Sequence, residues 1–166
     1  ALGDFKTMVL EVSRSPAMLQ FLNNQQNRKG KPNENFAREL MELFTLGRGN
    51  YTENDIKEAA RAFTGWGFNQ DGEFQFRQQL HDGDQKTFFG KTGNFDGADI
   101  IDIILKKPIA AEFIARKIYV FLVNDVADET HVKELGAYLY SHDYDIGDLV
   151  KKILTSDWFY DPKNIG

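Results

Sequence analysis

The chain has 166 residues, a formal net charge of −5 and no cysteine, and aromatic residues make up 13% of it. A chain of this length is usually one domain, long enough to bury a hydrophobic core. The absence of cysteine excludes disulfide scaffolds, cysteine-ligated zinc and thiol nucleophiles. The acidic balance argues against a nucleic-acid partner, and no apolar run reaches the roughly 18 residues of a membrane span. We therefore expect a single globular domain over residues 1–166.

The front of the chain predicts two helices and a loop. Apolar residues at helical spacing predict the first helix over residues 4–12, and Ser15 followed by Pro16 is typical of an N-cap with proline at the first helical position. Residues 23–32, with the sequence NNQQNRKGKP, predict a flexible polar loop. Its basic residues are too few to indicate nucleic-acid binding in a chain with a net charge of −5.

A strong helix is predicted from Asn33, as N-cap, to Gly47, which sits where a C′ glycine belongs. Its expected apolar face ends in Leu43 and Phe44, and Glu39 falls at the border of that face, where a carboxylate needs a partner. The next helix is predicted to start at Thr52 with a capping-box pattern and to stop at Gly65.

Residues 66–97 form a predicted insert between helices. Aromatic residues alternate over 66–78 around Asp71-Gly72, which predicts a β-hairpin because a DG turn supplies the positive φ that tight hairpins need. Residues 81–97 contain four glycines and predict a long irregular loop, which is either functional or mobile.

Four further helices are predicted after the insert: one over 98–107, one over 109–123, one that is capped by Asp128 or Thr130 and ends at Tyr140, and one that is capped by Asp145 and has inward residues as far as Leu154. The second of them is expected at the centre of the core. The predicted fold is mainly α, a bundle of about seven helices with one small β-hairpin and a glycine-rich loop. Five phenylalanines are expected in the helical core: Phe36, Phe44, Phe63, Phe113 and Phe121.

Two groups of residues are candidates for chemistry. Glu39 and Glu42, near Arg38, could act as acid and base if burial separates their pKa values, and the alternative is an ordinary ion-paired surface. His81 and Asp82 could relay a proton or, with Asp84, bind a metal ion. The alternative there is a simple turn, because zinc needs three or four ligands.

Other motifs are incomplete. The His142-Asp143 doublet lacks the further His and Asp ligands that helical phosphohydrolases use, and Gly90-Lys91-Thr92-Gly93 lacks the preceding glycine register of a P-loop. No cofactor is implied by the sequence.

Three longer stretches, read together, resemble one family. They are PNENFARELMELFTLG at 32–47, the segment from Tyr51-Thr52 to Thr64-Gly65-Trp66, and HDGDQKT at 81–87. They are similar to the large bacterial family of proteins of unknown function named DUF1800, and the resemblance extends over nearly the whole chain.

The resemblance implies that this chain is a piece of a longer protein, and that the protein is secreted, periplasmic or on the cell surface. It implies no reaction. The polar positions of the family motifs that we expect to matter for binding are Asn33, Glu34, Asn35, Arg38, Trp66 and Lys86. Either these groups form a buried hydrogen-bond network, which can fix a fold without chemistry, or they line a site.

Two hypotheses on function follow. The first is a binding or structural module, with another exported protein or a surface glycan as partner, and it predicts an exposed aromatic patch made of Trp66, Phe68, Phe74 and Phe76. The second is an exported hydrolase-type enzyme, in which His81-Asp82 act together with Glu39, Glu42 and Arg38. It predicts that these side chains converge in one pocket.

Overall fold

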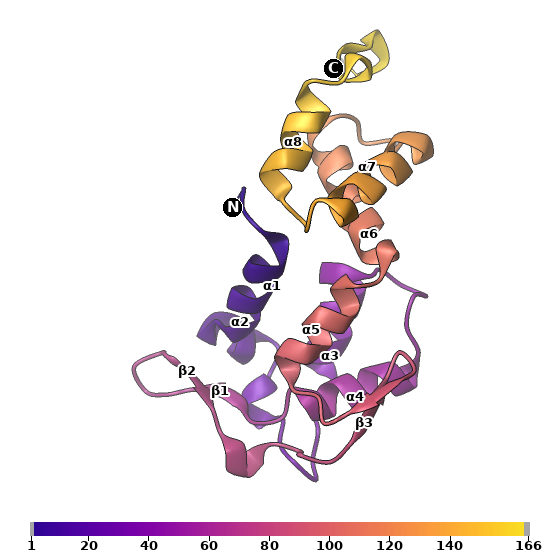
Figure 1. Cartoon of the computed structure of the whole chain (residues 1–166). Helices are drawn as coiled ribbons and strands as arrows, with labels where there is room; N and C mark the ends of the chain where they lie inside the picture. Colours follow the sequence, from indigo (N-terminus) through magenta and orange to yellow (C-terminus); the bar gives the residue numbers. More distant parts are fainter. Residues whose placement is uncertain (1, 165–166) are drawn as a thin grey trace. The chain divides into compact units, whose positions relative to one another are not determined.

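The computed structural model describes residues 2–164 and is mainly α-helical with two small hairpins, which confirms the predicted fold class (Figure 1). Contacts divide the chain into two compact units. The first contains the described residues up to Met8 and those from Lys107 onward, and the second is Val9–Lys106. No helix in the described residues is long and apolar enough to cross a membrane.

The second unit carries most of the motifs. Its elements, together with α1, which begins in the first unit, are α1 (Phe5–Arg14), α2 (Pro16–Phe21), η1 (Asn24–Gln26), α3 (Asn35–Glu39), η2 (Leu40–Thr45), α4 (Glu53–Ala62), β1 (Trp66–Phe68), β2 (Phe74–Phe76), η3 (Gln78–Leu80), β3 (Lys86–Phe88), β4 (Lys91–Gly93) and α5 (Gly97–Leu105). Thr52 and Asp55 form the predicted capping box of α4.

The predicted helix from Asn33 to Gly47 is two elements, because η2 is a π-helix. The Leu46 amide donates to the Met41 carbonyl at 2.8 Å, and the Thr45 hydroxyl donates to the Leu40 carbonyl at 2.6 Å; both bonds reach back five residues. This wider turn changes which residues face the core. Leu40, Met41 and Thr45 are buried, whereas Leu43 and Phe44 are exposed, so the expected apolar face was wrong there.

Both hairpins are antiparallel. The first was predicted and pairs Trp66 with Phe76. The second, β3–β4, lies where the sequence predicted an irregular loop, and it turns at Phe89-Gly90, whose φ values are 47° and 75°. Two consecutive positive φ values are typical of a type I′ turn, which joins two strands with little splay.

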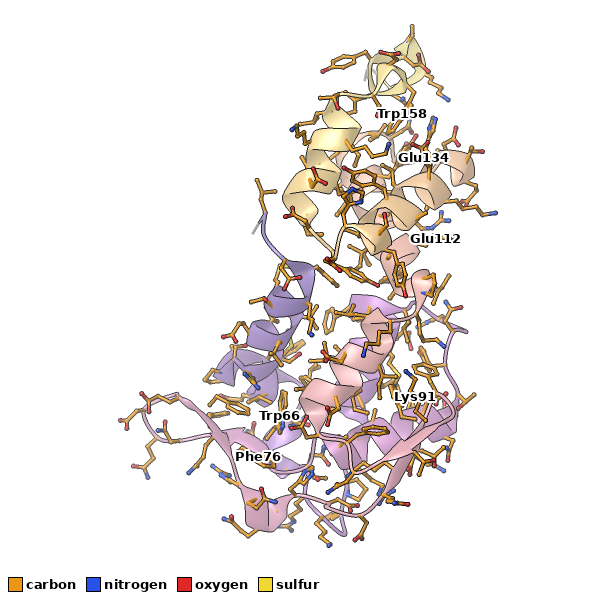
Figure 2. All side chains as sticks on the ribbon, viewed as in Figure 1. Trp66, Phe76, Lys91, Glu112, Glu134 and Trp158 are labelled. Carbon is orange, nitrogen blue, oxygen red and sulfur yellow. The ribbon has the colours of Figure 1, made fainter. Side chains whose placement is uncertain are left out.

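A chain of edge-to-face aromatic contacts anchors the first hairpin in its unit. Ring centroids lie 4.8 Å apart between Phe36 and Phe63, 5.1 Å between Phe63 and Trp66, and 5.2 Å between Trp66 and Phe74. Trp66 is only 3% exposed while Phe76 is 40% exposed. Both side chains are labelled in Figure 2. The expected patch of four exposed aromatic side chains was therefore wrong for Trp66, because this ring is buried against Phe63 in the core.

The first unit is built on a close helix pair. Besides the start of α1 it contains α6 (Pro108–Leu122), α7 (Glu129–Ser141), α8 (Ile146–Leu154), η4 (Asp157–Tyr160) and η5 (Pro162–Asn164). Gly136 of α7 lets the α6 backbone approach, since a Cβ there would lie 2.7 Å from Glu112 Cα. Phe121 was expected in the core but is 87% exposed, because α6 buries the opposite face, which includes Ala111, Ala115 and Tyr119.

Candidate functional site

Arg38 is the centre of one ion-paired group. Its two terminal nitrogens donate to Glu53 at 2.9 and 2.8 Å, and Nη2 also lies 3.3 Å from Glu34. Hydrogen bonding to Glu53 raises the pKa of the Arg38 guanidinium above its usual range. Glu53 opens α4, so this group clamps α3 onto the start of the next helix.

Glu42 belongs to a separate group. It accepts hydrogen bonds from Arg48 Nε and, at 2.8 Å, from the Tyr51 hydroxyl. These bonds hold the pKa of the Glu42 carboxyl below its usual range, and burial together with the bond to Glu42 raises the pKa of Tyr51 to about 12. Glu39 is half-buried, and no hydrogen bond or ion pair of its carboxylate is found within residues 2–164.

Buried asparagines hold the loop before α3. Asn27 Nδ2 donates to the Ala60 carbonyl at 2.8 Å, and Asn27 Oδ1 accepts from the Asn33 amide at 2.9 Å. Asn24 Nδ2 donates to the carbonyls of Phe63 and Trp66 at 3.2 and 3.1 Å. Asn35 continues the network, since its side chain donates to the Leu22 carbonyl and its amide to Asn33 Oδ1. The loop is thus fixed on α4 and β1.

His81 is buried and faces the protein interior. Its Nδ1 lies 2.9 Å from the Thr64 carbonyl oxygen, and its ring meets Phe76 edge to face at 5.1 Å. A carbonyl oxygen only accepts, so Nδ1 carries the proton in this arrangement. The imidazole therefore acts as a donor that ties residue 81 to the turn after α4.

Asp82 is paired with Arg61. Arg61 Nε and Nη2 donate to the two carboxylate oxygens at 2.8 and 3.3 Å, and the Asp84 amide donates to Oδ1 at 3.0 Å. Burial raises the pKa of the Asp82 carboxyl, but these hydrogen bonds outweigh it and hold the pKa below the usual 3.8. The Asp82 amide donates to Thr64 Oγ1 at 2.7 Å, so the backbone is fixed as well.

Lys86 is fully buried, which is rare for lysine. Its ammonium donates to the carbonyl oxygens of Asp82 and Asp84 at 2.6 and 2.9 Å and lies 3.4 Å from Asn94 Oδ1. Burial lowers the pKa of this amine despite the nearby carboxylates. Lys86 thus binds the backbone of the glycine-rich loop, as a bound cation would.

The residues that the hydrolase hypothesis requires to converge bond to different partners in the structure. His81, Asp82 and Lys86 lie together at the end of α4, whereas Arg38 pairs with Glu34 and Glu53, and Glu42 pairs with Arg48 and Tyr51. Asp84, the third weak metal candidate, has a 73% exposed side chain 3.9 Å from Lys29. Residues 2–164 contain no group of three or more His, Cys, Asp or Glu side chains that could hold a metal ion.

A cleft of about 690 Å³ lies in the second unit between residues 25–34 and residues 77–80. We call it the basic cleft, and its lining residues are Gln25, Gln26, Arg28, Lys31, Pro32, Asn33, Glu34, Arg77 and Leu80. Three of them are cations and only one is a carboxylate, although the whole chain is acidic.

Comparison with known proteins identifies the family. A family model described as "Protein of unknown function (DUF1800)" matches residues 1–166, the whole chain. The chain belongs to the DUF1800 family. Searches of the curated proteins and of the solved structures found no match.

Sequence reasoning missed the basic cleft of this DUF1800 chain, although it named two of the lining residues, Asn33 and Glu34. The available signal was the basic loop at 28–31, which was considered only for nucleic acid. Arg77 and Leu80 carried no signal, because they join the cleft only through folding.

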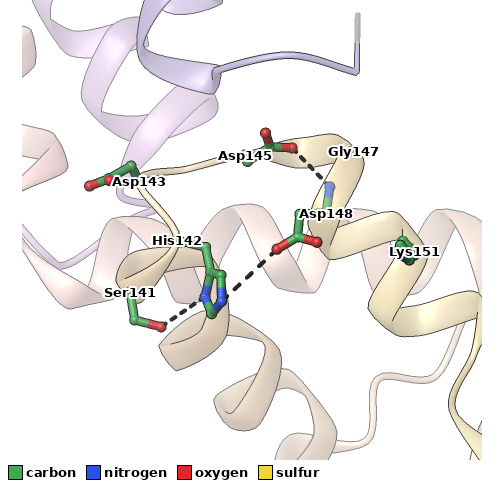
Figure 3. A pocket seen from close by; sticks show the side chains of 7 residues that line it. All are labelled: Ser141, His142, Asp143, Asp145, Gly147, Asp148 and Lys151. Carbon is green, nitrogen blue, oxygen red and sulfur yellow. Dashed lines mark hydrogen bonds and ion pairs between the residues drawn. The ribbon is translucent and has the colours of Figure 1, made fainter.

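A second depression of the DUF1800 chain, of about 610 Å³, lies at the α7–α8 turn (Figure 3). Ser141 Oγ is 3.1 Å from His142 Nδ1, and His142 Nε2 is 4.0 Å from Asp148 Oδ2. This resembles a catalytic triad, but Nδ1 also lies 2.8 Å from the Tyr138 carbonyl oxygen and so carries the proton. A nitrogen that already holds a proton does not accept one from serine.

Proposed function

We propose that this chain is a binding module and that the basic cleft is its binding site. The supporting observation is that both walls of the cleft are fixed on a single residue, Gly65. Its amide donates to the Asn27 carbonyl at 3.2 Å on one wall, and its carbonyl accepts from the Arg77 amide at 2.8 Å on the other. A cleft with preset walls loses little conformational entropy when a ligand binds.

The polar side chains of the motifs support this function by holding the walls of the cleft and the neighbouring loops in place. Asn27 and Asn33 hold the first wall, and His81 holds the chain directly after the second wall on Thr64. Arg61 and Lys86 use their donors on protein oxygens nearby. Buried and satisfied polar networks of this kind specify one packing of loops that lack regular structure.

The hydrolase hypothesis receives less support. It requires His81 and Asp82 to share a pocket with Arg38 and the two carboxylates, whereas His81 bonds to Thr64, Arg38 to Glu34 and Glu53, and Glu42 to Arg48. The basic cleft contains no histidine and one carboxylate, Glu34, which is paired with Arg38.

A thermal-shift screen against glycans, small metabolites and divalent metals tests the proposal. Gln26 is exposed and lines the cleft, so Gln26→Trp fills the cleft without touching the buried network. Ligands of the module raise the melting temperature of the wild type and fail to raise that of Gln26→Trp. Ligands that shift both proteins equally would bind elsewhere and would contradict the proposal.

Two variants of His81 test whether this residue has a structural or a catalytic role. In His81→Asn the amide nitrogen replaces the Nδ1 donor to Thr64, whereas His81→Ala removes it. The scaffold role predicts that the asparagine variant retains most of the stability and all ligand shifts. A metal-induced or substrate-dependent signal lost in both variants would favour the hydrolase.

The proposal includes an exported compartment, with a surface glycan or a second exported protein as the source of the ligand. It is supported by the likeness of the motifs to a family whose members look exported. A fusion of the natural full-length protein to alkaline phosphatase, which is active only outside the cytoplasm, tests the compartment.

A further inference from the structure

We infer that the basic cleft binds a small anion that carries hydroxyl groups, such as a phosphorylated or carboxylated sugar. The inference rests on the proposed function and names the ligand class of that same site. The charge of the cleft, an unpaired buried acceptor, a hydrogen-bonded backbone and the size of the cleft each support it.

The charges of the cleft are mostly uncompensated. Within residues 2–164, Arg28, Lys31 and Arg77 have no described ion pair; Arg77 donates to the Phe68 carbonyl and to Gln75 instead. The carboxylate of Glu34 is 3.3 Å from Arg38 Nη2. A concave surface with low-dielectric walls concentrates such a field and attracts an anion even to an acidic protein.

The Gln25 side chain indicates hydroxyl groups on that anion. Gln25 is partly exposed and lines the cleft, and within residues 2–164 its buried Oε1 has no hydrogen-bond partner. An acceptor left unsatisfied in this way costs about 1–3 kcal/mol. A turn of the partly exposed Gln25 side chain brings this oxygen to the cleft, where a ligand hydroxyl group offers it a donor and a simple carboxylate or phosphate dianion offers none.

Backbone hydrogen bonds hold the basic turn at residues 28–31 within the loop that the sequence predicted to be flexible. The amides of Arg28 and Lys31 each donate to the carbonyl of the other, at 3.4 and 2.9 Å, and Gly30 between them has a φ of 78°. The Lys29 amide donates to the Leu80 carbonyl at 2.8 Å and joins the turn to the opposite wall. The two cationic side chains therefore project from a fixed backbone.

The size fits a small molecule. A volume of about 690 Å³ lies within the range of roughly 300–1,000 Å³ that is typical of small-ligand sites. The apolar surface of Pro32 and Leu80 suits the carbon face of a sugar ring. A nucleic acid would require a longer basic surface than one turn provides.

Isothermal titration calorimetry at low ionic strength tests the inference with four probes: glucose 6-phosphate, glucuronate, glucose and inorganic phosphate. We expect either or both of the anionic sugars to bind at least tenfold more tightly than glucose and than inorganic phosphate, and the two sugars tell a phosphate ligand from a carboxylate one. The double variant Arg28→Gln/Lys31→Gln should weaken this binding at least tenfold. Lys91→Gln, at an exposed site on β4, should leave it unchanged.

Gln25→Leu separates the hydroxyl contact from the charge. It should weaken the anionic sugar while leaving inorganic phosphate unaffected, and the melting temperature of each variant checks that it is folded. Equal binding of glucose, equal binding of inorganic phosphate, or no binding of any probe would overturn the inference. If other ligands still shift the wild type but not Gln26→Trp in the thermal screen, the binding function stands and only this ligand class fails.

Discussion

The ammonium group of Lys86 lies 2.6 Å from the carbonyl oxygen of Asp82, and the lysine is fully buried. The side chain of the same aspartate binds Arg61, so residue 82 is held on two sides by cations. Because loop backbones need partners for their carbonyl groups, one internal ammonium replaces the strand pairing that residues 82–85 lack. This explains how the start of the glycine-rich segment is held next to α4.

Replacing Lys86 with methionine tests this role. Met fills a similar volume but donates no hydrogen bond, so the carbonyls of Asp82 and Asp84 lose their partner. We expect a loss of about 2–4 kcal/mol in the free energy of unfolding. Urea unfolding can be followed by the fluorescence of Trp66, which lies in the same unit, after Trp158 of the other unit is replaced by phenylalanine.

The matched control is Lys91→Met, at an exposed lysine on β4 (Figure 2). It should change stability by less than about 0.5 kcal/mol. A Lys86→Met protein as stable as this control would show that the buried ammonium does not hold the loop.

Asp82 predicts a specific dependence on pH. Its pKa in the folded protein lies below the usual 3.8, so the unfolded chain binds more protons at low pH. The stability that the Arg61–Asp82 pair contributes is thus fully present above the unfolded pKa of about 3.8 and is lost as the pH falls through the folded pKa. Asp82→Asn should cost about 1–3 kcal/mol at neutral pH, and its difference from the wild type should shrink on acidification.

Urea titrations at several pH values between neutral and acid measure that difference. Asp84→Asn is the control, because the Asp84 side chain is 73% exposed and its ion pair with Lys29 is long, at 3.9 Å. A constant difference between wild type and Asp82→Asn at every pH would contradict a lowered pKa.

The features that the sequence predicted correctly depend on short-range interactions. The capping box at Thr52, the Asp71-Gly72 hairpin and the C′ role of Gly47, whose φ is 78°, depend on neighbours within a few residues and were confirmed. The π-helix was missed because periodicity analysis assumes 3.6 residues in each turn. It moved Phe44 out of the expected core.

The candidate site was predictable only as a set of residues. The motif identified His81, Asp82 and Lys86 as candidates. It did not predict that His81 would bind Thr64 or that Lys86 would bind the loop backbone. The basic cleft joins residues about fifty positions apart through the two backbone groups of Gly65. No local pattern encodes such a contact.

The turn between α7 and α8 gives a prediction on Ser141. Because His142 Nδ1 donates to the Tyr138 carbonyl, Ser141 lacks a base and should not react with a fluorophosphonate probe. The wild type and Ser141→Ala should both remain unlabelled beside a serine hydrolase treated in parallel. Labelling of the wild type alone would show that this group is a nucleophile.

Gly65 is the position where fold and proposed site depend on one residue. Its φ is 81°, and a Cβ there would lie 2.7 Å from the Arg77 carbonyl oxygen, a backbone atom. Gly72 has a similar φ of 77° but no atom within 4 Å of a Cβ. Gly72→Ala should therefore cost only the strain of the left-handed conformation, about 1–2 kcal/mol, while Gly65→Ala adds the clash and should cost more.

Because that clash displaces the second wall of the basic cleft, Gly65→Ala should also abolish the ligand-induced thermal shift, which Gly72→Ala should retain. Urea unfolding and the thermal-shift assay measure the two effects, and equal results for both variants would remove Gly65 from its proposed role.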